Sequence, residues 1–222
     1  MVRQISFLFD GCLVSLQVFA LTLLFAVPLG FPLAAGRMSK NKILSALVNA
    51  FLLVIRGTPL MLQLILVYFT PGFVVKYLNE YYGLQIAFRL GRFPAAIIAL
   101  SVNYACYFAE IYRGGFQSIP VGQYEAALVL GYTERQTFFR IVLPQVVKRI
   151  IPPMGNEVIT LVKDTALVSV VGVVELLRTA QTASSRLFST TPIFVAGIFY
   201  FVMNWAVSSG FVFLEKKMSY YK

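Results

Sequence analysis

The stretch Glu125-Ala-Ala-Leu-Val-Leu-Gly131, which continues through Tyr132 to Ile141-Val-Leu-Pro-Gln145, decides how this chain is organised. It is amphiphilic and charged, and it separates long apolar segments. Its alanines allow a helix to lie close against another protein, and Thr133-Glu-Arg-Gln136 supplies an N-cap with its capping-box glutamine. We therefore predict a helix-turn-helix knob that docks a partner outside the apolar part of the chain. The alternative is an ordinary surface loop between two helices.

The composition of the whole chain is that of an integral membrane protein. Hydrophobic residues make up 59% of the 222 residues, charged residues make up only 13%, and the mean hydropathy is +0.78. A soluble domain carries a more charged surface. Because a spanning helix needs about 20 predominantly apolar residues, the length suffices for about five of them. The predicted fold is all-α and polytopic, with residues 1–222 forming one transmembrane domain.

The charge and cysteine content exclude several kinds of site. The formal net charge of +10 indicates basic loops that contact anionic membrane lipid, rather than a nucleic-acid partner. Cys12 and Cys106 lie in apolar runs and histidine is absent, so we expect no disulfide framework, no metal site and no cofactor bound by this chain. The run from Gly11 to Gly36 is longer than the core of a signal peptide, so we interpret it as a retained first helix.

Apolar runs predict the spanning segments, and prolines and polar residues predict their ends. Lys76 to Arg92 is polar and aromatic and is expected to form a loop or a surface-lying segment. Ile43 to Ile55 is expected to lie partly at the interface. The five predicted spans are Gly11 to Ala35, bent near Pro28 and Pro32; Leu60 to Phe69 and slightly beyond, closed by Pro71-Gly72; Pro94 to Ile111; Arg149 to Val174; and Pro192 to Leu214.

Basic residues predict the orientation in the membrane. With five spans, one side of the membrane collects the larger basic set, and this side is expected to be cytoplasmic. The N-terminus is then outside, the C-terminus is cytoplasmic, and residues 113–148 form a cytoplasmic coupling loop. The larger set comprises Arg37, Lys40, Lys42, Arg113, Arg135, Arg140, Lys148, Arg149, Lys216, Lys217 and Lys222, and the smaller set on the opposite side comprises Arg3, Lys76, Arg89, Arg92, Arg178 and Arg186.

Five motifs resemble one protein family. The Glu125 to Pro144 stretch resembles the cytoplasmic coupling motif of permease subunits in ATP-binding cassette importers, where the knob sits in a groove of the ATPase. The other motifs resemble signatures of the polar amino-acid branch of these permeases, with Ala166 standing where that branch often has serine. These motifs are Arg56-Gly-Thr-Pro-Leu60, Ala109-Glu-Ile-Tyr-Arg-Gly-Gly115, Ser118-Ile-Pro-Val-Gly-Gln123 and Lys163-Asp-Thr-Ala-Leu167.

The resemblance implies a type I importer fold in a bacterial inner membrane, and it implies partners. These are ATPase subunits that use ATP and Mg, a second permease subunit that is identical or homologous, and an extracytoplasmic amino-acid-binding protein. The outer segments from Tyr77 to Arg92 and from Arg178 to Ser189 would receive that binding protein. The residues implied to couple to the ATPase are Glu125, Ala126, Ala127, Gly131, Glu134 and Arg135.

Three polar residues of the fourth predicted span share one helical face. Glu157, Thr160 and Asp164 are spaced i, i+3 and i+7. Ionisable groups inside a membrane are costly and normally face a bundle interior, a water-filled cavity or a partner charge. The two carboxylates therefore predict a hydrophilic path that meets a substrate cation. Alternatively, Asp164 caps a helix break and Glu157 pairs with a basic side chain such as Lys163 of a neighbouring copy.

Other polar residues could face the same path. Asn103 and Tyr107 are four residues apart on the third span, and Gln63 lies on the second. The alternative for these three is hydrogen bonding between helices. Glu110 and Arg113, at i and i+3, are expected to form an ion pair that positions the chain where it enters the knob. We assign these two residues and Lys163 structural or coupling roles.

The sequence contains no chemistry for making or breaking bonds. It has no Gly-x-x-x-x-Gly-Lys phosphate loop, no Cys/His cluster and no nucleophile triad, so we expect no catalytic residues and a transport subunit rather than an enzyme. The predicted function is the permease of an ATP-driven importer for polar amino acids, either cationic ones such as arginine, lysine and histidine, or glutamine. An ion-coupled carrier or channel is the alternative, although it leaves the knob without a role.

Overall fold

A computed structural model describes the backbone of residues 2–218 and the side chains of residues 7–218. Within this range the chain is helical and has no β-strand, which confirms the predicted all-α class. Arg3 and Lys222, which entered the orientation prediction, lie outside the described side chains. The elements are α1 (Val2–Arg37), α2 (Lys42–Gly57), α3 (Leu60–Tyr82), α4 (Arg92–Gln117), α5 (Val121–Val129), α6 (Glu134–Thr137), the π-helical η1 (Phe138–Val142), α7 (Leu143–Asp164), the 3₁₀ helix η2 (Thr165–Val171), α8 (Leu176–Leu187) and α9 (Thr191–Lys217).

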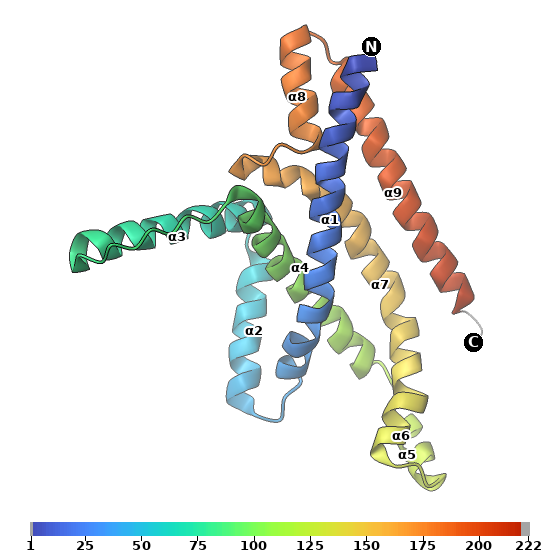
Figure 1. The fold of residues 1–222 in the computed structure, drawn as a ribbon. Helices are drawn as coiled ribbons and strands as arrows, with labels where there is room; N and C mark the ends of the chain where they lie inside the picture. Colours follow the sequence, from blue (N-terminus) through green and yellow to red (C-terminus); the bar gives the residue numbers. More distant parts are fainter. Residues whose placement is uncertain (1, 219–222) are drawn as a thin grey trace.

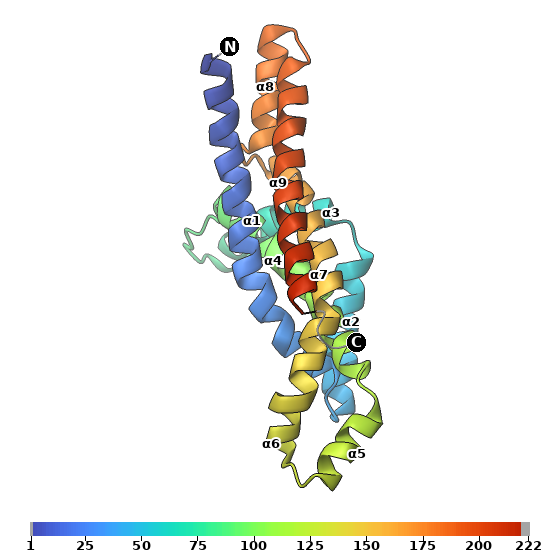
Figure 2. The ribbon, with the colours of Figure 1, turned by 90° about the vertical axis from the view of Figure 1, so that its right-hand side faces the viewer.

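The helices run between two distinct ends of the molecule (Figure 1). Helices α1, α4 and α9 run toward the end that carries α5 and α6, whereas α2 and α7 run away from it. Helix α8 and the start of α1 lie together at the opposite end, as both views show (Figure 2). Helix α3 projects sideways, across the direction of α1 and α9. The knob and the N-terminus are therefore at opposite ends.

Packing of α1 against α4 forms the main core. The phenol of Tyr112 on α4 donates a hydrogen bond of 3.1 Å to the carbonyl of Val27, and its ring stacks on Phe31 with centroids 4.3 Å apart. Gly30 allows this approach, because a Cβ there would lie 2.9 Å from the Tyr112 ring and 3.0 Å from the Phe108 Cβ. Helix α1 continues through Pro28 and Pro32 to Arg37, since α4 covers the turn that contains the prolines.

Four helices in the described residues are long and apolar enough to cross a membrane: α1 from Phe7, α3, α4 and α9. The fourth predicted span, Arg149 to Val174, corresponds to α7 and η2, and α7 is too charged to meet that criterion. Its charged residues are Lys148, Arg149, Glu157, Lys163 and Asp164. Helix α7 nevertheless extends from the knob toward the opposite end (Figure 1). That α7 crosses the membrane therefore remains a prediction from its place in the fold rather than from its composition.

The predicted end of the second span at Pro71-Gly72 is wrong. Helix α3 continues through Pro71 to Tyr82, so the first part of the expected loop from Lys76 is helical. A proline removes one donor and one intrahelical hydrogen bond, which a helix can tolerate in a membrane protein. The helix ends instead at Gly83, whose left-handed conformation (φ 64°) lets its N–H bond the Asn79 carbonyl at 3.1 Å.

Replacing Gly30 by leucine tests the α1–α4 contact. We expect overpacking to destabilise the protein by about 1–3 kcal/mol, because the new side chain meets the Tyr112 ring and the Phe108 Cβ. Gly72→Leu is the matched control, since a Cβ there has nothing within 4 Å. Thermal unfolding of the detergent-solubilised variants measures the difference. Equal melting temperatures for the two variants would contradict the assigned packing.

Candidate functional site

The knob has the predicted helix-turn-helix form. Helix α5 ends at Val129, Gly131 takes a positive φ of 75°, and α6 begins after Thr133. The predicted capping box is confirmed: the Thr133 N–H donates to Gln136 Oε1 at 2.9 Å, and the Gln136 N–H donates to Thr133 Oγ1 at 3.3 Å. Glycine is the residue that takes this left-handed turn at least cost. Local sequence thus sets the shape of the knob.

The tip of the knob exposes apolar side chains. Leu128, Val129 and Leu130 are 75%, 87% and 71% exposed, whereas Ala127 is fully buried against the rest of the knob. Among the predicted coupling residues, Glu125, Ala126, Gly131, Glu134 and Arg135 are all exposed. Adjacent apolar side chains of this kind indicate an interaction surface when they lie together at one end of a molecule.

The base of the knob is tied to both α4 and α7. The Gln145 amide donates to Gln123 Oε1 at 3.0 Å, which links α7 to α5. Phe116 on α4 stacks on Phe138 with centroids 6.0 Å apart, and the Arg149 guanidinium donates to the Ser118 carbonyl. The knob is therefore fastened to α4 and to α7 at the same time.

The predicted polar face of α7 meets α4. Tyr104 on α4 is buried, and its hydroxyl donates to Asp164 Oδ2 at 2.8 Å. Glu157 and Thr160 are half-buried, and the Thr160 hydroxyl donates to the Asn156 carbonyl one turn earlier. Asp164 lies where α7 gives way to η2, but its side chain makes no capping hydrogen bond there. The exposed Lys163 lies beside it in sequence.

Gln63 and Asn103 join helices. The Asn103 amide donates to Gln63 Oε1 at 2.9 Å, and the Gln63 amide donates to the carbonyl of Ile55 at 2.6 Å and to Thr58 Oγ1 at 2.8 Å. Gln63 and Asn103 are 8% and 5% exposed. The pair therefore fastens the break between α2 and α3 to α4, the arrangement expected of hydrogen bonding between helices.

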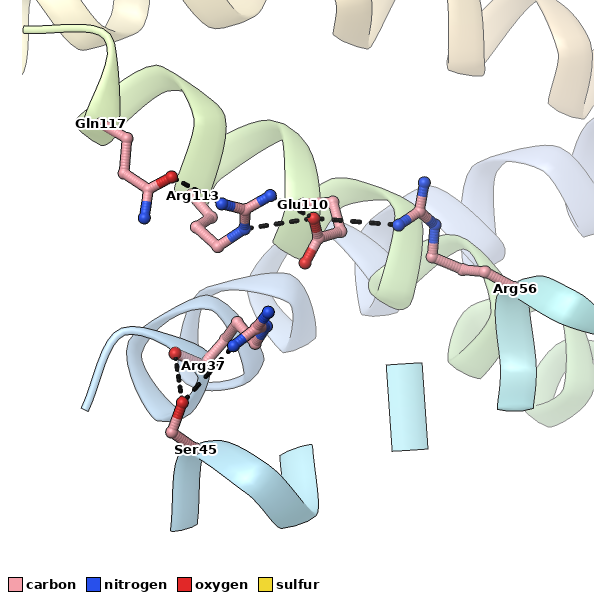
Figure 3. Close-up of polar contacts among 6 residues, drawn as sticks. All are labelled: Arg37, Ser45, Arg56, Glu110, Arg113 and Gln117. Atoms are coloured by element: carbon pink, nitrogen blue, oxygen red, sulfur yellow. Dashed lines mark hydrogen bonds and ion pairs between the residues drawn. The ribbon is translucent and has the colours of Figure 1, made fainter. Parts of the chain in front are cut away.

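Four charged groups gather at the last turns of α4 (Figure 3). The predicted Glu110–Arg113 ion pair is present, with Arg113 Nη2 2.6 Å and Nε 3.1 Å from Glu110 Oε2. Arg56 approaches the same oxygen from the end of α2 at 3.8 Å, so that Glu110 lies between the two guanidiniums. Arg37 lies below them and reaches Ser45 Oγ at 3.5 Å. Arg56 also stacks over the Tyr107 ring, 5.2 Å from its centroid.

Sequence reasoning does not single out Arg56 or Glu175. Arg56 belongs to a motif, although a charge inside an apolar run is itself a signal of a functional or paired group. Tyr104 is a hydrogen-bonding residue of the third predicted span, but nothing local identifies Asp164 as its partner. Glu175 is fully buried and holds the start of α8 by accepting the N–H groups of Leu177 and Arg178, both at 2.7 Å, and the Tyr200 hydroxyl at 2.9 Å. Its role is to fix α8 against α9.

Among the residues that the structure describes, no group of three or more His, Cys, Asp or Glu side chains is placed to hold a metal ion. The two free cysteines are buried and far apart in sequence. Among the described residues, α2, α4 and α7 together present carboxylates, amides, hydroxyls and the partly exposed guanidiniums of Arg56 and Arg113.

Comparison with known proteins agrees with this arrangement. Residues 26–220 match the family model described as binding-protein-dependent transport system inner membrane component. A Rickettsia felis protein provisionally named as the glutamine transport system permease protein GlnP is 32% identical, over 97% of this chain and 94% of its own. The arginine transport system permease protein ArtQ of Bacillus subtilis is 34% identical, over 91% of this chain and 88% of its own.

A solved structure supports the same comparison in three dimensions. The crystal structure of an amino acid ABC transporter with histidines matches with a TM-score of 0.82 and 32% identity. The match covers 98% of this chain and 96% of that one. The sequence and the fold therefore point to the same class of protein.

Substituting leucine for Asn103 tests the assignment of the Gln63–Asn103 pair to helix packing. The change leaves the buried Gln63 Oε1 without its donor, so we expect a loss of about 1–3 kcal/mol of stability. Transport per folded molecule should keep the same KM, because the pair holds helices together. Uptake measured alongside the folded fraction separates the two effects. An altered KM with unchanged stability would place Asn103 in the path instead.

Proposed function

The chain belongs to the family of binding-protein-dependent inner membrane transport components, as the permease subunit of an amino-acid ABC importer, and from that premise we propose that its substrates are cationic amino acids. The observation that carries the proposal is the pair of carboxylates Glu157 and Asp164 on the face of α7 that meets α4. Arginine, lysine and histidine are the substrates of this class. Glutamine is the neutral alternative.

Charge is the reason for preferring cations. An ionised carboxylate inside a membrane bundle is costly unless a cation or hydrogen-bond donors face it. Asp164 has the Tyr104 hydroxyl, while Glu157, within the described residues, forms no hydrogen bond or ion pair. A substrate ammonium or guanidinium would supply the missing partner. Thr160 adds a hydroxyl between the two carboxylates in sequence.

The driving force comes from partners. The family implies ATPase subunits and a substrate-binding protein, and the ATP and Mg are used by the ATPase. In the proposed arrangement the exposed tip at Leu128 to Leu130 docks the ATPase, and the links from Gln123 to Gln145 and from Phe116 to Phe138 pass its motion to α4 and α7. A second permease subunit, identical or homologous, completes the path. The binding protein docks on the segments from Tyr77 to Arg92 and from Arg178 to Ser189, the second of which includes most of α8 at the end opposite the knob.

The positions of the knob and of the basic residues indicate which end of the protein faces the cytoplasm. The knob and the loop between α1 and α2, which carries Lys40, lie at one end of the molecule (Figure 1). Basic residues and an ATPase-binding surface both belong on the cytoplasmic side. The N-terminus is then outside and the C-terminus cytoplasmic, in a bacterial inner membrane. The alternative function, an ion-coupled carrier or channel, would not need the exposed apolar knob.

Replacing Gly131 by leucine tests the role of the knob. A side chain at φ 75° strains the turn by about 1–3 kcal/mol and displaces the apolar tip. We expect the protein to insert normally but to lose ATPase binding and uptake. Gly114→Leu is the control, because that glycine is also exposed and has open space but no positive φ. Copurification of the ATPase is the measurement, and uptake that persists without bound ATPase would favour the ion-coupled carrier.

Replacing Glu157 by glutamine tests the substrate class. The change removes the charge at similar size, so stimulation of ATPase activity by a cationic amino acid should fall at least tenfold more than stimulation by glutamine. The assay uses the permease, its ATPase and its binding protein reconstituted in liposomes, with a panel of amino acids. If stimulation by cationic and by neutral amino acids falls equally, Glu157 has a structural role and does not select the substrate.

A further inference from the structure

The guanidinium of Arg56 is held in place but only partly neutralised. Its ion pair with Glu110 is 3.8 Å long, which is beyond hydrogen-bond distance. Glu110 is already bonded at 2.6 Å and 3.1 Å by Arg113, so the same oxygen serves two cations. The Arg56 side chain is 40% exposed, and within the described residues its guanidinium makes no hydrogen bond. Its planar donors therefore remain available.

The position of Arg56 is set by a rigid frame. Arg56 is the penultimate residue of α2, directly before the Gly57-Thr58-Pro59 break that the Gln63 amide fastens through Ile55 and Thr58. The guanidinium lies over the Tyr107 ring at 5.2 Å, a cation–π contact that orients its plane. Such preorganisation lowers the entropic cost of binding an anion.

The same frame places Arg56 beside the carboxylates of the path. The Tyr107 ring lies 6.3 Å from the Tyr104 ring, and the Tyr104 hydroxyl bonds Asp164 at 2.8 Å. One end of this polar line is therefore cationic and the other end is anionic.

An amino acid carries the complementary charges. Its α-carboxylate is common to every member of the class, whereas the charge of the side chain varies. A planar guanidinium can bind a carboxylate through two parallel hydrogen bonds, which gives both affinity and geometry. Arg113 is bonded to Glu110 and to Gln117, and its side chain is 28% exposed. Arg37 is half-buried and lies 3.5 Å from Ser45 Oγ. Arg56, 40% exposed, is therefore the most exposed guanidinium of this cluster.

We propose that Arg56 binds the α-carboxylate of the transported amino acid, while Glu157 and Asp164 receive its positively charged groups. The inference rests on the proposed function, because it requires an amino acid between α2, α4 and α7. Binding replaces the long contact to Glu110 with a shorter, bidentate one. Arg56 then selects for free amino acids over analogues that lack the carboxylate, whatever their side chain.

The test compares each amino acid with its carboxamide, which replaces the carboxylate by a neutral group. The permease–ATPase complex is placed in lipid nanodiscs without the binding protein and loaded with radiolabelled arginine. Displacement of the label by unlabelled arginine or argininamide gives the affinity of each. The same comparison is repeated with labelled glutamine, displaced by glutamine or glutaminamide. The wild-type complex should bind the acid at least tenfold more tightly than the amide. Arg56→Gln should weaken binding of the acid at least tenfold, leave binding of the amide unchanged and bring their ratio close to one.

Two further variants complete the test. Lys42→Gln removes the same charge from the exposed start of α2 and should keep the wild-type ratio. Arg56→Lys retains the charge without the two parallel donors, so its ratio of acid to amide affinity should be intermediate. This variant replaces Arg56→Gln in the test if Arg56→Gln folds poorly. A wild-type complex that binds acid and amide equally, or an Arg56→Gln complex that keeps the wild-type ratio, overturns the assignment of Arg56 while leaving the importer in place. A wild-type complex that binds no amino acid overturns both the substrate class and this inference.

Discussion

Polar groups inside an apolar bundle must find partners within the protein, and this constraint organises the structure. In a membrane no water is at hand to satisfy an amide or a carboxylate, so a donor, an acceptor or an opposite charge from another helix stabilises such a group. Gln63 meets Asn103, Tyr104 meets Asp164, and Glu110 meets two arginines. These contacts all involve α4, the most deeply buried of the apolar helices. Helix α4 therefore carries the polar contacts between helices as well as the centre of the hydrophobic core.

The same helix connects the path to the knob. Its inner part carries Asn103, Tyr104 and Tyr107, and its last turns carry Glu110 and Arg113 before the chain enters α5. Helix α7 returns from the knob and ends in Asp164, which meets Tyr104 on α4. Because both helices are fastened to the knob, a movement there would change the spacing of the two sides of the proposed path. This geometry suits an importer in which the source of energy and the substrate site are on different subunits.

The break between α2 and α3 gives the site its third side. Thr58 and Pro59 end one helix and begin the next, and the Gln63 amide closes the gap through backbone and hydroxyl acceptors. Arg56 is displayed at this break because a helix end leaves a long side chain free to reach sideways. Helix α3 then departs across the bundle (Figure 1) and leaves large apolar side chains exposed, among them Phe73, Tyr77 and Tyr81. Lipid or the second permease subunit would cover them.

The sequence by itself determined the all-α class, the membrane character and the shape of the knob, because these follow from local periodicity and from contacts a few residues apart. The Thr133–Gln136 capping box and the Glu110–Arg113 pair are of this kind. Only the tertiary structure decided that Tyr104 bonds Asp164, 60 residues away, and that Gln63 meets Asn103, 40 residues away. Likewise, only the structure showed that α3 continues through Pro71 and that Glu175 is buried at the start of α8. Apolar helix faces can pack in many registers, so the sequence pattern marks which residues need a partner, and the assembled helices determine which partner each one finds.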